Sequence, residues 1–230
     1  MNDQSETAQL RFLEETAIRL RQNGFTVEPI EDHHLPVCWE KGRLCRISGK
    51  GSVLYRQECV DSVRAQDALQ TVIDTVKMTS EYMAILETAP RLKASGLDGD
   101  YRILADFGGT VLAGTPSKHG VQFVTWDWDY DRTGVSHGHY FMENYDEAKQ
   151  DFAIRSGLIH KEHFFSTEQL TEIFRCCADS VDEDFFELTD TQEEMIRGIQ
   201  QQIRVCVPDL DERVRQQDEA LERASQEQTM

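Results

Sequence analysis

The chain has 230 residues and a formal net charge of −18, from 42 acidic and 24 basic side chains. The excess is uneven, since residues 1–140 carry −5 and residues 141–230 carry −13. This charge repels a phosphate backbone, so direct binding to nucleic acid is disfavoured. A basic protein partner would be attracted instead.

Two features of the sequence concern its location in the cell. No apolar run approaches the roughly 20 residues that a membrane-spanning helix needs. The first six residues are polar and acidic, unlike a signal peptide. We therefore expect a cytoplasmic protein with no membrane partner.

Residues 1–90 predict an α-β-β-β-α unit. Apolar residues recur at helical spacing over about 7–22, and Asn23-Gly24 ends that helix. A second, longer helix is expected over about 62–88 and closes at Pro90. Between the helices, short strands are expected at 25–27, 36–40, 44–47 and 52–56.

Residues 91–100 are rich in turn formers and predict a linker to a second unit at 101–207. The second unit begins with a β-meander, with strands at 101–107, 110–113, 121–130 and 135–141. Three helices are expected to follow, at 145–156, 166–180 and 189–205. Residues 208–230 predict a charged tail that is a frayed helix or disordered. The whole chain is thus expected to be α+β.

The segment 126–140 contains the main candidate site, because acids and aromatic residues alternate before a turn and two histidines follow it. Strand geometry sends alternate side chains to opposite faces. In the simplest register Asp129 faces His137 and Asp127 faces His139. The opposite, buried face would hold Trp126, Trp128 and Tyr130.

Two interpretations of this hairpin stay open. Asp127, Asp129, His137 and His139 could form a metal site or an acid–base pair. They could equally decorate a solvated strand face as Asp–His pairs. A change of one residue in the register would separate each histidine from its aspartate. A calcium loop is disfavoured, because its glycine and its final glutamate are missing.

Other motifs of enzymes and cofactor sites are absent from the sequence. The six cysteines include no CxxC pair, which argues against a structural zinc site, and their even number does not imply disulfides. The sequence contains no GxGxxG, Walker, GxSxG or HExxH motif. We therefore expect no cofactor and favour a protein that is not an enzyme.

Three stretches, at 100–114, 120–126 and 147–159, together resemble a family of accessory proteins carried on conjugative and integrative elements of gut Firmicutes. The resemblance covers roughly residues 90–210. It implies a bacterial cytoplasm and a mobile element, and it carries over no functional residues.

Three functional hypotheses follow. The leading one is a non-enzymatic interaction protein of a mobile element, with a protein partner that is basic or itself binds nucleic acid. An alternative is an acidic inhibitor of host defence nucleases, of the anti-restriction or anti-CRISPR kind, that imitates the charge of DNA. The third is a metal-dependent enzyme that uses the Asp/His hairpin. The sequence indicates neither the partner-binding residues nor the oligomeric state.

Overall fold

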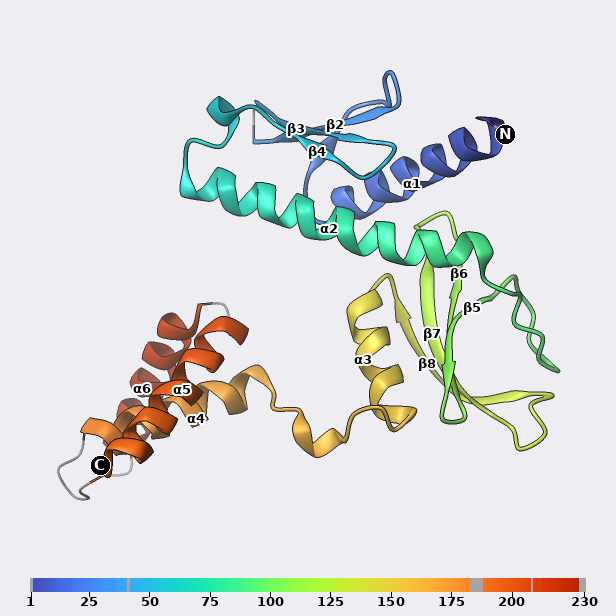
Figure 1. The fold of residues 1–230 in the computed structure, drawn as a ribbon. Helices are drawn as coiled ribbons and strands as arrows, with labels where there is room; N and C mark the ends of the chain where they lie inside the picture. The colour runs from blue at the N-terminus through green and yellow to red at the C-terminus, as the bar shows by residue number, and fades with distance from the viewer. Residues whose placement is uncertain (1, 41, 183–187, 208, 228–230) are drawn as a thin grey trace. The chain divides into compact units, whose positions relative to one another are not determined.

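The computed structural model describes residues 2–40, 42–182, 188–207 and 209–227. The chain forms two compact units, Met1–Ile159 and His160–Met230 (Figure 1). Helices and antiparallel sheets are both present, which confirms the mixed α+β class.

The first unit begins with a four-stranded antiparallel sheet covered by two helices. Its elements in chain order are α1 (Asn2–Gln22), β1 (Thr26–Val27), β2 (His34–Trp39), β3 (Gly42–Ser48), β4 (Val53–Leu54), η1 (Gln57–Cys59) and α2 (Val63–Thr88). The strands lie side by side in sequence order. Gly24, with a φ of +84°, ends α1, and the Ser62 side chain accepts a hydrogen bond from the Ala65 amide to begin α2. Four strands lie between the two helices, at or near the four segments expected to be strands, whereas the predicted α-β-β-β-α order counted three.

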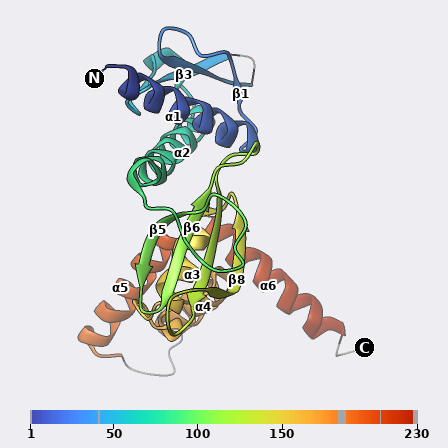
Figure 2. The same ribbon diagram turned by 90° about the vertical axis from the view of Figure 1, so that its right-hand side faces the viewer.

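A second antiparallel sheet follows in the same unit. It contains β5 (Arg102–Phe107), β6 (Thr110–Thr115), β7 (Gln122–Trp128) and β8 (Val135–Met142), again in sequence order. The predicted meander is therefore confirmed. Helix α3 (Tyr145–Arg155) packs on one face of this sheet, against β6, β7 and β8 (Figures 1 and 2).

The segment at 91–100 is not the linker that we predicted. Leu92 is buried, and its amide donates to the Tyr101 carbonyl at 2.8 Å. The Ser95 amide donates to the Thr133 carbonyl at 2.7 Å, which ties the segment to the loop between β7 and β8. Leu92, Leu97 and Tyr101 pack in the apolar cluster of Trp126. The segment therefore covers the sheet face opposite α3, because the apolar side chains on that face must be buried.

A buried polar network joins α1 and α2 to the second sheet. Glu15 and Arg19 form an ion pair at 2.8 Å, with side chains only 8% and 3% exposed. The Tyr82 hydroxyl donates to Glu15 at 2.7 Å and accepts from Arg19 at 3.0 Å. Glu15 also accepts from the Val121 amide at 2.9 Å, and Arg19 donates to the Val121 carbonyl. Both sheets therefore belong to one unit.

The second unit is helical. Its elements are η2 (Lys161–His163), α4 (Thr167–Asp182), α5 (Asp190–Cys206) and α6 (Leu210–Glu227). A capping box begins α5, with Thr189 and Gln192 bonded reciprocally. A small cluster of Phe174, Ile203, Val207 and Leu210 is buried.

The unit boundary differs from the predicted one. The boundary lies between residues 159 and 160, inside the predicted 101–207 unit. Helix α3 packs on the second sheet, whereas α4 packs on α5 and α6. Most of the predicted 208–230 tail is helix α6, whose Leu210 is buried and whose Val214 packs on the core. Pro208 and residues 228–230 lie outside the described residues. Within the described part, no helix is long and apolar enough to cross a membrane.

The buried network predicts the effect of removing one hydroxyl. Tyr82→Phe removes the buried hydroxyl that donates to Glu15 and accepts from Arg19, so we expect the free energy of unfolding of the first unit to fall by about 1–3 kcal/mol. Urea unfolding followed by tryptophan fluorescence measures this, because Trp39, Trp126 and Trp128 all lie in the first unit. Tyr140→Phe is the control, since Tyr140 is 64% exposed. Equal stability of the two variants would contradict the prediction.

Candidate functional site

The register of the β7–β8 hairpin differs from the one that the sequence predicted. Thr125 pairs with His139 and Asp127 pairs with Ser136. The predicted pairs, Asp127 with His139 and Asp129 with His137, are therefore wrong. The ladder shifts between Thr125 and Asp127, which is a β-bulge.

His137 and Gly138 form the bulge. His137 has a φ of +49°, in the left-handed region that non-glycine residues rarely adopt. A Cβ on Gly138 would clash with the indole nitrogen of Trp126. The extra residue moves His137 away from its predicted partner and re-aims the following side chains.

Asp127 is held by α3 and by the neighbouring strand. Arg155, the last residue of α3, binds the Asp127 carboxylate at 2.7 Å. The Thr110 hydroxyl donates to the other Asp127 oxygen at 3.2 Å. His137 approaches Asp127 at 3.8 Å with a side chain that is 79% exposed. The carboxylate is therefore neutralised mainly by a guanidinium that is only 13% exposed.

His139 has a different carboxylate partner. A hydrogen bond joins its Nδ1 to Asp151 Oδ1 at 3.0 Å. The second oxygen of Asp151 accepts a hydrogen bond from the Thr125 hydroxyl, and Arg155 lies 3.7 Å from that oxygen. Arg155 also donates to the Thr125 hydroxyl at 2.9 Å and to the His137 carbonyl at 2.8 Å. Asp151 and Arg155, one turn apart on α3, thus fasten that helix to the bulge.

The four predicted ligands are not brought together. Asp127 and His137 lie near each other, His139 pairs with Asp151, and Asp129 belongs to the turn, where its amide donates to the Gly134 carbonyl at 3.0 Å. The part of the chain that the structure describes contains no group of three or more His, Cys, Asp or Glu side chains that could hold a metal. Chemically, the arrangement is a set of compensated carboxylates that fixes α3 on the sheet.

The aromatic face of the hairpin is largely as predicted. Trp126 is buried, Trp128 is half-buried, and both pack with Tyr101 and Leu92. The Trp126 and Tyr101 rings meet edge to face at 4.9 Å. Tyr130 is the exception, since it lies beyond the end of β7 and is fully exposed.

The helical unit presents a second candidate surface, which is an apolar groove. A pocket of about 240 Å³ lies between α4 and α5, lined by Glu172, Ile173, Cys176, Cys177, Ser180 and Ile196. Met195 and Ile199 are four residues apart and so share one face of α5, and Ile199 lies three residues from Ile196, which places this face beside the groove. Their side chains are 62% and 37% exposed. An uncovered apolar face of this kind is typical of an interaction surface.

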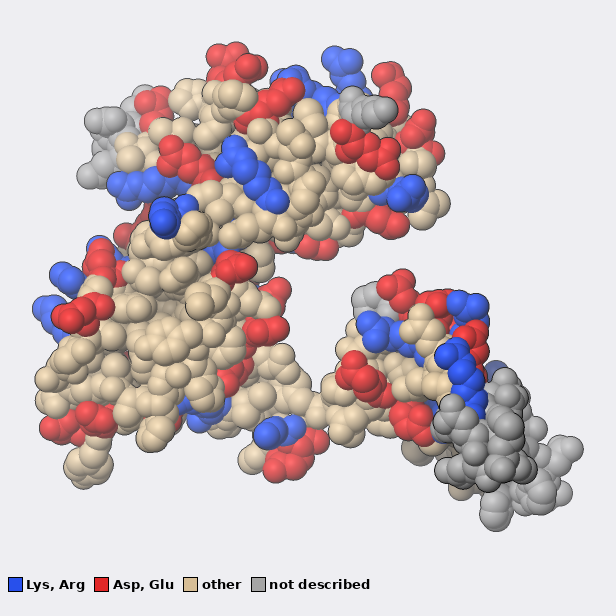
Figure 3. Space-filling view, turned by 180° about the vertical axis from the view of Figure 1, so that it is seen from behind, with Lys and Arg blue, Asp and Glu red and all other residues tan. Residues whose placement is uncertain are grey.

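The groove lies in the most acidic part of the chain. Residues 160–230 carry 18 acidic and 7 basic side chains, a net charge of −11. Acidic and basic side chains stand close together on the part of this unit seen in Figure 3. Arginines of the three long helices form ion pairs with neighbouring acids: Arg175 with Glu172, Arg197 with Glu193, Arg204 with Asp211, Arg215 with Glu212, and Arg223 with Glu219. These pairs leave the unit with an excess of acidic side chains.

All six cysteines are free thiols. Cys177 is half-buried in the groove, where desolvation raises the pKa of its thiol and Cys176 adds to the rise. It is therefore protonated at neutral pH and contributes apolar surface.

Comparison with protein-family models, curated proteins and solved structures gives no match for this chain.

Sequence reasoning missed Asp151, Arg155 and the groove. Asp151 and Arg155 are four residues apart on a predicted helix, which places them on one face. The sequence does not show that this face is turned toward the hairpin. The bulge could have been predicted from Gly138, because an isolated glycine inside a strand pattern is typical of a bulge.

The cluster predicts that Arg155 stabilises the first unit. Arg155→Met leaves Asp127 and Asp151 without their shared counter-charge, so we expect a loss of about 1–3 kcal/mol. Arg91→Met is the matched control, because Arg91 forms an exposed ion pair with Asp100 that should contribute at most about 1 kcal/mol. Tryptophan fluorescence in urea measures both. A loss for Arg155→Met no larger than that for the control would refute the fastening role.

The bulge predicts that Gly138 cannot accept a side chain. Gly138→Ala forces Trp126 to move, and we expect a loss of about 1–3 kcal/mol. Gly42→Ala serves as the control, because a Cβ there meets no atom within 4 Å. The same unfolding experiment compares them, and an unchanged midpoint for Gly138→Ala would show that the bulge does not need glycine.

Proposed function

We propose that this protein is a non-enzymatic interaction protein whose helical unit binds a basic amphipathic helix of a protein partner. The observation that carries the proposal is the apolar groove between α4 and α5, which lies within a unit of net charge −11.

The thin core of the helical unit supports this proposal. Among the residues of this unit that the structure describes, only a few apolar side chains are buried, while Met195 and Ile199 are exposed on α5. A partner helix with apolar residues at i, i+3, i+4 and i+7 would cover this face. Each apolar square ångström removed from water adds about 25 cal/mol of stabilisation.

Charge complementarity selects a basic partner. Glu172 lines the groove and is paired with Arg175, so the attraction depends on the net charge of −11 of the unit and not on this acid. Lysine and arginine side chains on the polar edges of a partner helix would be attracted by that net charge. An acidic helix of equal hydrophobicity would be repelled.

The charge of the helical unit also favours a second candidate, an acidic inhibitor that occupies the basic channel of a nuclease. Against it, the ion pairs of α6 place arginines among the acids, so the helix carries no unbroken acidic row. A DNA mimic would need the negative charge and not the groove, which gives the two candidates different tests. The mobile-element context and the metal-dependent enzyme stay predictions.

A synthetic 18-residue amphipathic helix of leucine and lysine is a suitable probe for the groove. We expect it to bind the full chain, measured by fluorescence anisotropy, at least about tenfold more tightly than a leucine–glutamate helix of the same pattern. Met195→Glu and Ile199→Glu place a charge on the apolar face, and each should weaken binding by about tenfold. Val205→Glu is the control, because Val205 is 78% exposed and projects from another side of α5.

A lysine–serine peptide of equal charge separates the two candidates. If it binds as tightly as the leucine–lysine helix, charge alone is responsible for binding, and this result supports the DNA-mimic candidate. If neither peptide binds, or if the α5 variants bind like the wild type, the groove proposal is overturned.

A further inference from the structure

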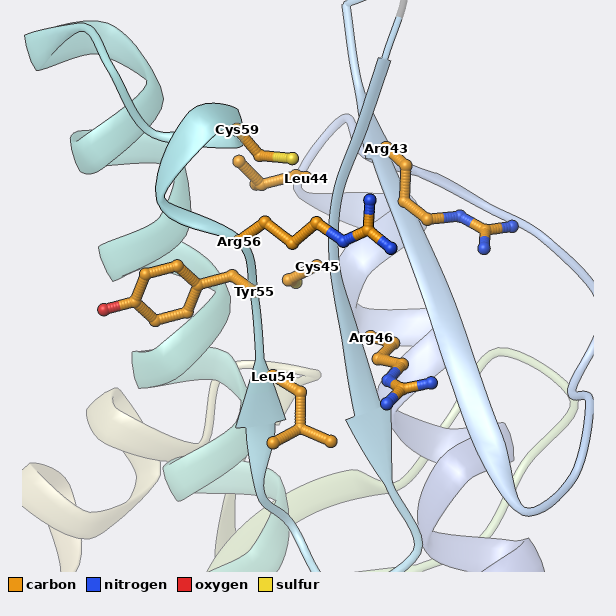
Figure 4. A pocket seen from close by; sticks show the side chains of 8 residues that line it. All are labelled: Arg43, Leu44, Cys45, Arg46, Leu54, Tyr55, Arg56 and Cys59. Carbon is orange, nitrogen blue, oxygen red and sulfur yellow. The ribbon is translucent and has the colours of Figure 1, made fainter.

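The first sheet contains a pocket beside strand β4, away from the helical unit's groove. Strand β4 pairs with β3 only at Ile47 and Arg46, and β3 continues beyond this point to Gly42. After Leu54 the chain leaves the sheet and forms η1, which contacts β3 again at a different place. A pocket of about 370 Å³ occupies this gap (Figure 4).

The pocket has a buried apolar base and a cationic rim. Leu44 and Cys45 of β3 are each only 3% exposed. Arg43, Arg46 and Arg56 line the pocket and are exposed. Figure 4 shows Arg56 reaching from the segment after β4 toward β3, on the side where Arg43 and Arg46 lie, while Tyr55 points the other way.

These arginines are incompletely neutralised in a chain that otherwise has an excess of acids. Arg43 forms an ion pair with Glu28, and its hydrogen bond to Glu28 raises its pKa. Arg46 and Arg56 form no ion pair or side-chain hydrogen bond with any residue that the structure describes. Arg46 and Arg56 therefore add two positive charges to the rim that no carboxylate among the described residues pairs with.

We propose that this pocket binds the dianionic phosphate group of a small molecule. A phosphate monoester carries about −1.5 to −2 charges and three acceptor oxygens at neutral pH, which matches the local surplus. Guanidinium groups bind phosphate through paired N–H donors, so Arg46 and Arg56 can each donate two parallel hydrogen bonds to it. A carboxylate supplies one charge and two oxygens, and would leave part of the rim unpaired.

The volume of the pocket and the net charge of the protein favour a small ligand over a polyanion. A pocket near 370 Å³ lies in the range of small-molecule sites, roughly 300–1,000 Å³. The net charge of −18 repels nucleic acid at longer range, whereas a single phosphate feels mainly the nearby arginines.

The buried Cys45 thiol forms no covalent bond to the ligand. Burial raises the pKa of the Cys45 thiol to about 12, with smaller contributions from Cys38 and Cys59. The thiol therefore stays protonated at neutral pH and is not a nucleophile. It contributes to the apolar base of the pocket.

Titration of the isotope-labelled full chain, followed by NMR of the arginine side-chain N–H signals, tests the proposal. We expect phenyl phosphate to give saturable shifts at Arg43, Arg46 and Arg56, and to bind at least about fivefold more tightly than benzoate. R46Q and R56Q should each weaken binding by about tenfold. R64Q is the control, since Arg64 is an exposed residue of α2 outside the pocket.

A comparison of phenyl phosphate with inorganic phosphate distinguishes an organic phosphate ligand from free phosphate. Tighter binding of phenyl phosphate than of inorganic phosphate supports an organic monoester, and equal binding supports free phosphate; both agree with a phosphate pocket. Benzoate binding as tightly as phenyl phosphate, or unchanged binding in both R46Q and R56Q, would overturn the proposal. Met195→Glu should leave these shifts intact, so failure of the helical groove and failure of this pocket are distinguishable.

Discussion

The buried ion pair of Glu15 and Arg19 is the constraint on which the first unit depends. A buried charge is costly unless every donor and acceptor around it is satisfied. Here the satisfying partners come from three places far apart in the sequence: Tyr82 on α2, the backbone of Val121 before β7, and the carbonyl of Glu143 before α3. The network is complete only when the helices of the first sheet and one end of the second sheet are in place. The pair therefore makes one unit from two sheets that would each have a core of their own.

A second polar cluster, at the C-terminal end of α3, fastens that helix to the second sheet. Arg155 connects Asp127 and Asp151 to the backbone of Thr125 and His137. In both clusters one arginine neutralises carboxylates and also satisfies carbonyl groups, which a planar guanidinium with five donors can do. Asp127, one of the candidate ligands in the hairpin, is thus part of the packing of α3.

The remaining charged surfaces differ in how far they are neutralised within the molecule. On α4, α5 and α6, arginines pair with acids one turn away, and a negative surplus remains beside an apolar groove. On the first sheet, Arg46 and Arg56 line a pocket without such partners within the described residues. The two surfaces lie in different units and suit ligands of opposite charge. At each surface, a ligand of complementary charge would neutralise the surplus charge beside an apolar surface.

The sequence by itself determined the features that depend on near neighbours in the chain. The helices at α1, α2, α3 and α5, the β5–β8 meander, the capping box at Thr189 and the acidic surplus all follow from spacing, caps and composition. Tertiary structure decided the rest. The bulge at His137 and Gly138 changed the hairpin register, because the packing of Trp126 excludes a side chain at that point. The segment at 91–100 became a cover instead of a linker, because the second sheet has two apolar faces to bury. The arginine pocket exists because β4 leaves β3 after two pairs, and the place where two strands separate depends on the whole sheet.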